Sequence, residues 1–146
     1  MVSAKIPFNY QQARLLAVLA LINFVNFADR QVFNPLIPLL RDHFGVSDTL
    51  LGALPFVLLV VLALASIPCG YLADRFNEPK IICAGVMVWS IAAIGSGLAP
   101  TFAVLFFMRG MVGIGEAAYA PAAQSLISDS FSKEHRALAQ SIFAAA

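Results

Sequence analysis

Residues 49–73 read TLLGALPFVLLVVLALASIPCGYLA, a stretch without a single Asp, Glu, Lys or Arg. A bilayer core about 30 Å thick needs about 20 apolar residues in a helix that rises 1.5 Å per residue. This stretch is long enough to cross a membrane. It therefore predicts a transmembrane helix over residues 48–73.

Further apolar runs lie on both sides of this segment. Residues 81–108 are also uncharged, but a break containing Gly and Pro at residues 95–101 divides them between two helices. The first and last runs are interrupted by charges. The sequence predicts an all-α membrane protein with four transmembrane helices and part of a fifth. In order, we expect an N-terminal segment 1–13, helices over about 14–38, 48–73, 80–98 and 102–129, a loop 130–136, and the truncated start of a fifth helix at 137–146.

The composition restricts the class of protein. Hydrophobic residues make up 60% of the chain and charged residues 12%, against about 25% in soluble proteins, and the mean hydropathy is +0.84. The net charge of +1 provides no basic surface for a nucleic acid. These values exclude a disordered chain, a nucleic-acid binder and an ordinary water-soluble enzyme. Cys69 and Cys83 lie inside apolar runs without a metal-ligand spacing. Because the sequence also has no Ser/His/Asp set, metal cluster or cofactor motif, we expect no metal, no cofactor and no enzyme.

Positive charges gather in the loops that would share one side of the membrane. Cytoplasmic loops usually carry the excess of Lys and Arg. With a cytoplasmic N-terminus, the outer loops hold only Arg41. The inner segments then hold Lys5, Arg14, Arg75, Lys80, Lys133 and Arg136. We expect a multi-pass protein of a bacterial inner membrane with its N-terminus in the cytoplasm.

Four ionisable residues lie inside predicted helices: Asp29 and Arg30 in the first, Arg109 and Glu116 in the fourth. Each unpaired charge costs about 2.5–3.5 kcal/mol at the centre of a membrane helix, so four would cost on the order of 10 kcal/mol. These groups must therefore compete for partners or face a hydrated cavity. The spacing allows Arg30 to pair with Glu116 and Asp29 with Arg109, but does not fix this arrangement. The cluster is either a structural contact between helices or a transport and proton site, and we favour the site.

Polar residues at helical spacing favour a cavity. Four of them follow one face of the first helix: Asn23, Asn26, Arg30 and Asn34. In the fourth helix Arg109 and Glu116 share a face, and Gln124 continues it. One Asn could be an isolated interhelical hydrogen bond, but an extended row indicates a cavity. A carboxylate beside an arginine in such a cavity can gain or lose a proton as access to water changes, which is the minimum needed for proton-coupled movement of a solute.

The fourth helix also carries many small residues, among them Gly110, Gly113 and Gly115. Small residues let membrane helices approach closely, and Pro121 permits a kink. We expect this helix to pack tightly against its neighbours.

The turn after the second helix reads GYLADRFNEPK, residues 70–80. On physical grounds it is a charged cap, with Asp74 and Arg75 ending one helix, Lys80 near the start of the next, and Asn77 suited to the tight turn.

Two of these segments resemble family signatures. Gly70, Asp74, Arg75 and Lys80 match the loop signature of the major facilitator superfamily, and RGMVGIG at residues 109–115 resembles its second signature. More narrowly, NFADR at residues 26–30, the turn, and RGMVGIGEAAY at residues 109–119 resemble the Spinster-like branch, whose members export lysolipids or sphingosine phosphate. This resemblance covers nearly the whole chain.

The resemblance implies the N-terminal part of a twelve-helix carrier built from three-helix inverted repeats. It implies proton-coupled transport of an amphipathic solute such as a lysolipid or a sphingosine phosphate-like lipid. The expected partners are the solute, protons, membrane lipids and the remaining helices of the transporter. The implied sites are a proton-coupling ion-pair cluster of Asp29, Arg30, Arg109 and Glu116, a cavity lined by Asn23, Asn26, Asn34, Tyr119 and Gln124, and a gating loop of Gly70, Asp74, Arg75, Lys80 and Asp129.

The turn departs from the superfamily pattern. Asn77, Glu78 and Pro79 stand where the superfamily usually has Gly and two basic residues. A gating network linking Asp74 to Asp129 must then rely on Arg75 or Lys80.

Other functions remain open at this point. The aspartate–arginine pair of the first helix also resembles that of organic-anion:proton symporters in the same superfamily. A non-transporting membrane subunit or assembly factor could use the charges to bind partner helices. A small efflux pump built as a dimer of four-helix chains is disfavoured by the fifth run and by the loop signature.

Overall fold

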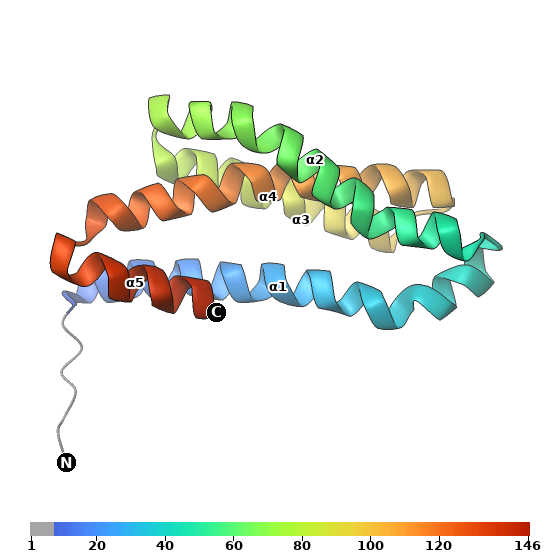
Figure 1. The fold of residues 1–146 in the computed structure, drawn as a ribbon, viewed down its shortest axis with the longest axis horizontal. Coiled ribbons are helices and arrows are strands. Elements are labelled where there is room, and N and C mark those ends of the chain that lie inside the picture. Colours follow the sequence, from blue (N-terminus) through green and yellow to red (C-terminus); the bar gives the residue numbers. More distant parts are fainter. Residues whose placement is uncertain (1–7) are drawn as a thin grey trace, which may run out of the picture.

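The computed structural model describes residues 8–146, apart from the side chain of Asp74. The described part folds into helices joined by short turns, as the sequence predicts (Figure 1). Lys5 and most of the expected N-terminal segment lie outside the described residues. The helices are α1 (Tyr10–Phe44), α2 (Asp48–Arg75), α3 (Glu78–Gly97), α4 (Phe102–Ser130) and α5 (Lys133–Ala145).

The helices form two layers (Figure 1). Helices α2, α3 and α4 lie together in one layer, and α1 and α5 lie side by side in the other. The turn between α1 and α2 is at one end of the bundle, here named the α1–α2 end. The turn between α2 and α3 is at the opposite end, named the α2–α3 end, together with the turn between α4 and α5.

Local capping explains where the first helix begins and ends. Asn9 caps α1, since its Oδ1 accepts a hydrogen bond from the Gln11 backbone N–H and its own backbone N–H donates to Gln12 Oε1. The helix therefore starts earlier than residue 14. It continues through Pro35 and Pro38 and ends at Phe44, where the C-cap residue Gly45 has a φ of 62°, a left-handed conformation that favours glycine. The apolar run marks only the part of this helix that would face lipid.

The fifth helix differs from the expectation in the same way. It begins at Lys133 rather than at 137, so the expected loop 130–136 is reduced to Phe131 and Ser132. Ser132 is the N-cap residue, and Glu134 in the first turn suits the positive end of a helix. Hydropathy missed this turn because its residues are charged, although their backbone is helical.

Glycines bring α4 into close contact with both neighbours in its layer. A Cβ atom added to Gly113 would lie 2.7 Å from the Leu58 carbonyl oxygen of α2, and one added to Gly115 would lie 2.6 Å from the Trp89 amide nitrogen of α3. Gly85 of α3 faces Gly115 with no more room. The expected tight packing of α4 is therefore present on two sides of the helix.

The contacts of α1 with α4 and α5 combine apolar packing, through Leu16 and Leu19, with side-chain hydrogen bonds. Near the α2–α3 end, the Tyr119 hydroxyl donates to the Leu19 carbonyl oxygen at 2.9 Å. The Asn23 amide donates to the Phe143 carbonyl oxygen at 3.0 Å, and Gln12 donates to Ser130 at 2.8 Å. Side-chain hydrogen bonds therefore attach α1 to α4 and α5.

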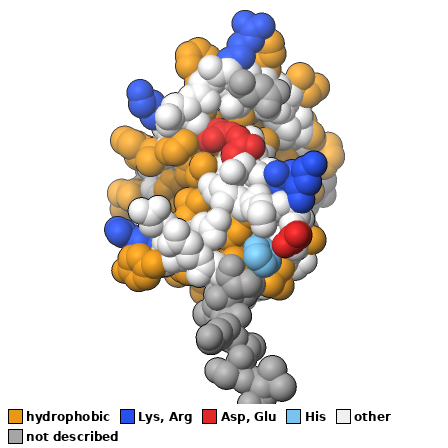
Figure 2. Space-filling view, turned by 90° about the vertical axis from the view of Figure 1, so that its left-hand side faces the viewer, with side chains coloured by type: hydrophobic (Ala, Val, Ile, Leu, Met, Phe, Trp, Pro, Cys, Tyr) orange, Lys and Arg blue, Asp and Glu red, His pale blue; other side chains and the backbone are white. Residues whose placement is uncertain are grey.

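The outside of the bundle suits lipid. Four helices in the described part are long and apolar enough to cross a membrane: Tyr10–Phe44, Asp48–Ala73, Glu78–Gly97 and Phe102–Ser130. Figure 2 looks onto the α2–α3 end, where Lys and Arg side chains stand near the rim and hydrophobic side chains lie around the sides. Large exposed side chains such as Leu64, Ile67 and Met87 would contact acyl chains in a bilayer.

Candidate functional site

Two ion pairs connect α1 to α4 near the middle of both helices. Arg109 Nη1 lies 2.9 Å from Asp29 Oδ2. Arg30 pairs with Glu116 through two contacts, of which Nε to Oε1 measures 3.4 Å. Asp29 and Arg30 are adjacent in α1 and carry opposite charges, and each of them pairs with a residue of the opposite charge on α4. The structure selects this pairing, which the sequence allowed but did not fix.

The pairing explains how these charges are tolerated. The side chain of Glu116 is 2% exposed and that of Arg109 is 6% exposed. A buried charge without a partner costs several kcal/mol, so each of these groups depends on its partner in α1. Arg30 is different, because its side chain is 41% exposed. It is the member of the cluster with room to leave its partner.

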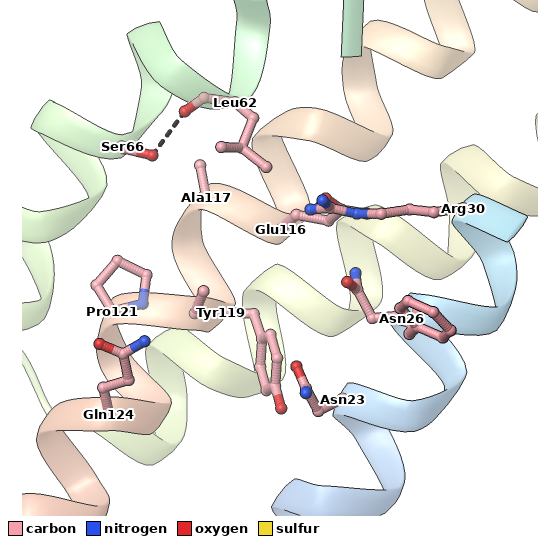
Figure 3. Close-up of a pocket in the computed structure, with 12 residues that line it drawn as sticks. Asn23, Asn26, Arg30, Leu62, Ser66, Glu116, Ala117, Tyr119, Pro121 and Gln124 are labelled. Atoms are coloured by element: carbon pink, nitrogen blue, oxygen red, sulfur yellow. Dashed lines mark hydrogen bonds and ion pairs between the residues drawn. The ribbon is translucent and has the colours of Figure 1, made fainter. Parts of the chain in front are cut away.

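A cavity of about 400 Å³ borders the Arg30–Glu116 pair. Figure 3 shows Arg30 reaching from α1 to Glu116 on α4 with Asn26 close to the pair, whereas Asn23 lies beside Tyr119 and Gln124 lies on the far side of the cavity near Pro121. Four of the five residues expected to line a cavity are here: Asn23, Asn26, Tyr119 and Gln124. Leu62 and Ser66 of α2 complete the wall.

A second cavity of about 360 Å³ lies towards the α1–α2 end. It contains Asn34, the fifth expected residue, which is therefore separate from the other four. Phe27 and Arg30 line both cavities. The wall of this second cavity is mostly apolar, with Ile37, Leu54, Leu58 and Leu59 among its residues.

Not every lining residue has a free polar group. The Tyr119 hydroxyl and the Asn23 amide nitrogen already bind backbone carbonyl oxygens. The Asn26 amide nitrogen is buried without a hydrogen-bond partner in the described part of the chain. Asn26 therefore has the unused donor beside the Arg30–Glu116 pair.

Sequence reasoning missed two contributors. Phe33 lies with its ring 3.7 Å from Arg109 Cζ, one helical turn after Asp29. Ser66 carries a hydroxyl in the apolar middle of α2, and that contrast was the available signal. For Phe33 the only available signal was that it follows Asp29 by four residues and so lies on the same face of α1. Many apolar residues have such a spacing from a charged residue, so it does not single out Phe33.

The expected gating loop is only partly described. Arg75 stacks on Tyr71, with Cζ 4.3 Å from the ring centroid. Among the side chains that the structure describes, no ion pair joins Asp129 to Arg75 or Lys80. The Asp74 side chain lies outside the described residues, so its network stays a prediction.

Glu78 connects this turn to α4 through a side-chain hydrogen bond. Its Oε1 accepts a hydrogen bond from the Ser125 hydroxyl at 2.7 Å. Glu78 is one of the residues that depart from the superfamily pattern. This carboxylate links the start of α3 to α4.

Known proteins resemble this chain in sequence. The profile of the Major Facilitator Superfamily matches residues 19–146. Human "Protein spinster homolog 1" is 34% identical over 135 residues, which are 91% of this chain and 26% of the relative. The mouse "Sphingosine-1-phosphate transporter SPNS2" is 38% identical over 129 residues, 87% of this chain and 24% of the relative.

A solved structure agrees with the fold. The crystal structure of a bacterial homolog of the human lysosomal transporter Spinster, in an inward-facing and unoccupied conformation, matches with a TM-score of 0.87 and 36% identity. The match covers 94% of this chain and 29% of that chain. The chain spans about a quarter of the length of the curated relatives described above. It is an integral, multi-pass membrane protein that belongs to the major facilitator superfamily, in its Spinster-like branch.

Proposed function

We propose that this chain acts, together with the remaining helices of a longer carrier, in proton-coupled transport of an amphipathic anionic solute such as a lysolipid or sphingosine phosphate. The observation that carries the proposal is the position of the Arg30–Glu116 pair beside a cavity. The names of the relatives support the solute class, since one is a sphingosine-1-phosphate transporter and others are spinster homologs.

The two cavities suit a solute with a polar head and an apolar tail. Amide side chains and Arg30 line the first cavity, and mostly apolar side chains line the second. Because Phe27 and Arg30 border both, one solute could place its anionic group at Arg30 and its chain along the second wall. Arginine is well suited to bind such a phosphate or carboxylate through two hydrogen bonds.

Exchange of partners would couple the solute to a proton. When the anionic group binds Arg30, Glu116 loses the guanidinium that balances its charge. Glu116 is 2% exposed, so an unpaired carboxylate there is strongly disfavoured and takes up a proton. Departure of the solute reverses both changes, because Arg30 returns and the proton leaves.

We further propose that the α2–α3 end faces the cytoplasm. Arg75, Lys80, Lys133 and Arg136 lie in or next to the turns at this end. Arg41 lies at the opposite end, where it pairs with Asp48. This distribution follows the usual excess of positive charge on cytoplasmic loops.

The alternatives predict different solutes or partners. An organic-anion:proton symporter would take small anions without an apolar chain, which would leave the apolar side chains of the second cavity, such as Ile37 and Leu58, without a part of the solute to contact. An assembly factor would offer its charges to partner helices. Asp29, Arg30, Arg109 and Glu116 instead satisfy one another within this chain.

Transport by the full-length carrier in proteoliposomes tests the proposal. A pH gradient should drive uptake of sphingosine 1-phosphate, and Glu116→Gln should abolish this dependence while solute exchange continues. Glu134→Gln, at the exposed start of α5, is the matched control and should transport normally. Undiminished coupling in Glu116→Gln would remove Glu116 from the mechanism. Uptake of a short dicarboxylate but not of the lipid would favour the organic-anion alternative.

A further inference from the structure

Arg109 is held from two directions by one face of α1. Asp29 accepts a hydrogen bond from its guanidinium at 2.9 Å, and the Phe33 ring lies over the guanidinium, 3.7 Å from Cζ. Residues four apart in a helix lie one above the other on the same face. Asp29 supplies the negative charge, and Phe33 supplies the negative face of an aromatic ring.

The environment makes the ring contact a strong one. Cation–π attraction increases when the cation is shielded from water, and the Arg109 side chain is 6% exposed. Arg109 lines the second cavity and a further cavity of about 330 Å³ near the α1–α2 end, and Phe33 lines both of these as well. Phe33 therefore borders both of the cavities that Arg109 lines.

The ring is itself anchored at the α1–α2 end. Phe33 packs against a buried cluster formed by Leu51 and Leu54 of α2 and Leu105 of α4. Ile37 and Leu40 of α1 pack against the same cluster. Because Phe33 is on α1 and Arg109 is on α4, any movement of α1 away from Leu105 of α4 at this end would pull the ring away from Arg109.

We propose that Phe33 is a positioning residue, whose ring holds the Arg109 guanidinium on Asp29 and ties that ion pair to the packing of α1 against the cluster of Leu51, Leu54 and Leu105. Opening of this end would loosen Arg109 and free Asp29. The inference goes beyond the proposed function. It rests on that function only where it gives the Asp29–Arg109 pair a role in transport.

A series of fluorinated phenylalanines at position 33 tests the contact directly. Each added fluorine weakens the negative face of the ring while the ring keeps nearly the same shape, so a role in packing alone would not respond. Thermal unfolding of the chain in nanodiscs is followed by Trp89 fluorescence. Trp89 is the single tryptophan and belongs to a buried cluster against which Ile22 of α1 packs. The unfolding temperature should fall stepwise, by about 3 °C in total.

Phe24 provides the matched control. It is on the same helix, is 56% exposed and would face lipid, so fluorination there should leave the unfolding temperature unchanged. The series at position 33 should also become flat in an Arg109→Gln background. A flat series at position 33 with Arg109 present, or equal slopes at positions 24 and 33, would overturn the inference. If Arg109→Gln does not fold, the comparison with Phe24 alone decides.

Transport adds a second readout. In the full-length carrier, Phe33→Leu should lower proton-driven uptake several-fold, and Phe33→Trp should restore it because indole is a good cation–π partner. Equal uptake by Phe33→Leu and the unmodified carrier would contradict the link to transport. A carrier that is inactive with Phe33 in place would refute the proposed function, whereas the fluorination series would still decide this inference.

Discussion

Helix α4 has two kinds of interface. Towards α2 and α3 it presents glycines, and the backbones approach so closely that added Cβ atoms would lie 2.6–2.8 Å from backbone atoms. Towards α1 it presents Arg109, Glu116 and Tyr119, which bind α1 through charges and one hydroxyl. Apolar side chains of α4 on either side of these groups pack against Leu16 and Leu19 and against Phe33 of α1. Close packing cannot be rearranged without cost, whereas an ion pair can exchange one partner for another. The difference indicates a rigid unit of α2, α3 and α4, to which the middle of α1 is attached through exchangeable ion pairs.

The largest effect is expected at the glycine interface. Gly115→Ala would place a methyl group against the Trp89 amide nitrogen and the Gly85 carbonyl oxygen, neither of which can move alone. The free energy of unfolding should fall by about 3 kcal/mol. Gly52→Ala is the control, because nothing lies within 4 Å of its added Cβ, and it should be neutral or slightly stabilising. Thermal unfolding by circular dichroism distinguishes these outcomes, and equal stability of the two variants would contradict close packing.

The polar interface should respond asymmetrically. Arg30→Gln leaves the buried Glu116 unpaired and should cost about 3 kcal/mol. Glu116→Gln leaves Arg30, 41% exposed, with access to water in the cavity, and should cost about 1 kcal/mol. The double variant should recover most of the loss seen in Arg30→Gln. Chemical unfolding of the three variants measures this, and equal losses in the two single variants would show that the burial difference has no consequence.

A smaller loss is expected at Tyr119. Tyr119→Phe removes the hydroxyl that donates to the Leu19 carbonyl oxygen but keeps the ring. The free energy of unfolding should fall by about 1 kcal/mol. Amide hydrogen exchange should increase in α1 near Leu19 and remain unchanged in α2. A rise in exchange across the whole bundle would contradict a local attachment.

The smallest effect is expected at the exposed Arg41–Asp48 pair. Its side chains are 50% and 70% exposed, so solvent screens their interaction. Arg41→Gln should change the free energy of unfolding by less than about 0.5 kcal/mol. If Arg41→Gln lowered the free energy of unfolding as much as Arg30→Gln does, solvent exposure would not explain the difference between the exposed Arg41–Asp48 pair and the partly buried Arg30–Glu116 pair.

The sequence predicted the spans, the helical class and the cluster of four charges because lipid enforces them. A charge in an apolar run needs a partner, so Asp29 and Glu116 stood out before any contact was known. Gly113 and Gly115 indicated close packing because small residues let membrane helices approach one another closely. The turn at Lys133 and the start of α1 at Tyr10 could not be read from hydropathy, because charged and capping residues define them.

The site itself was predicted less completely. Which charge pairs with which depends on the rotation and depth of α1 against α4, and helical spacing leaves errors of a few residues. Asn34 was grouped with Asn23 and Asn26, although it lines the other cavity. Phe33 carries no charge, so only its place over Arg109 distinguishes it from the other phenylalanines.

Distances between spin labels in the full-length carrier test the central claim most directly. Cysteines replace Leu64 on α2, Val25 on α1 and Met87 on α3, which are exposed, and Cys69 and Cys83 become serine. The double variant Asp29→Asn, Glu116→Gln breaks both ion pairs. The distance distribution from α1 to α3 should then broaden or shift, while that from α2 to α3 stays the same. An unchanged α1–α3 distribution, or an equal change between α2 and α3, would contradict a movable α1 on a rigid unit of α2, α3 and α4.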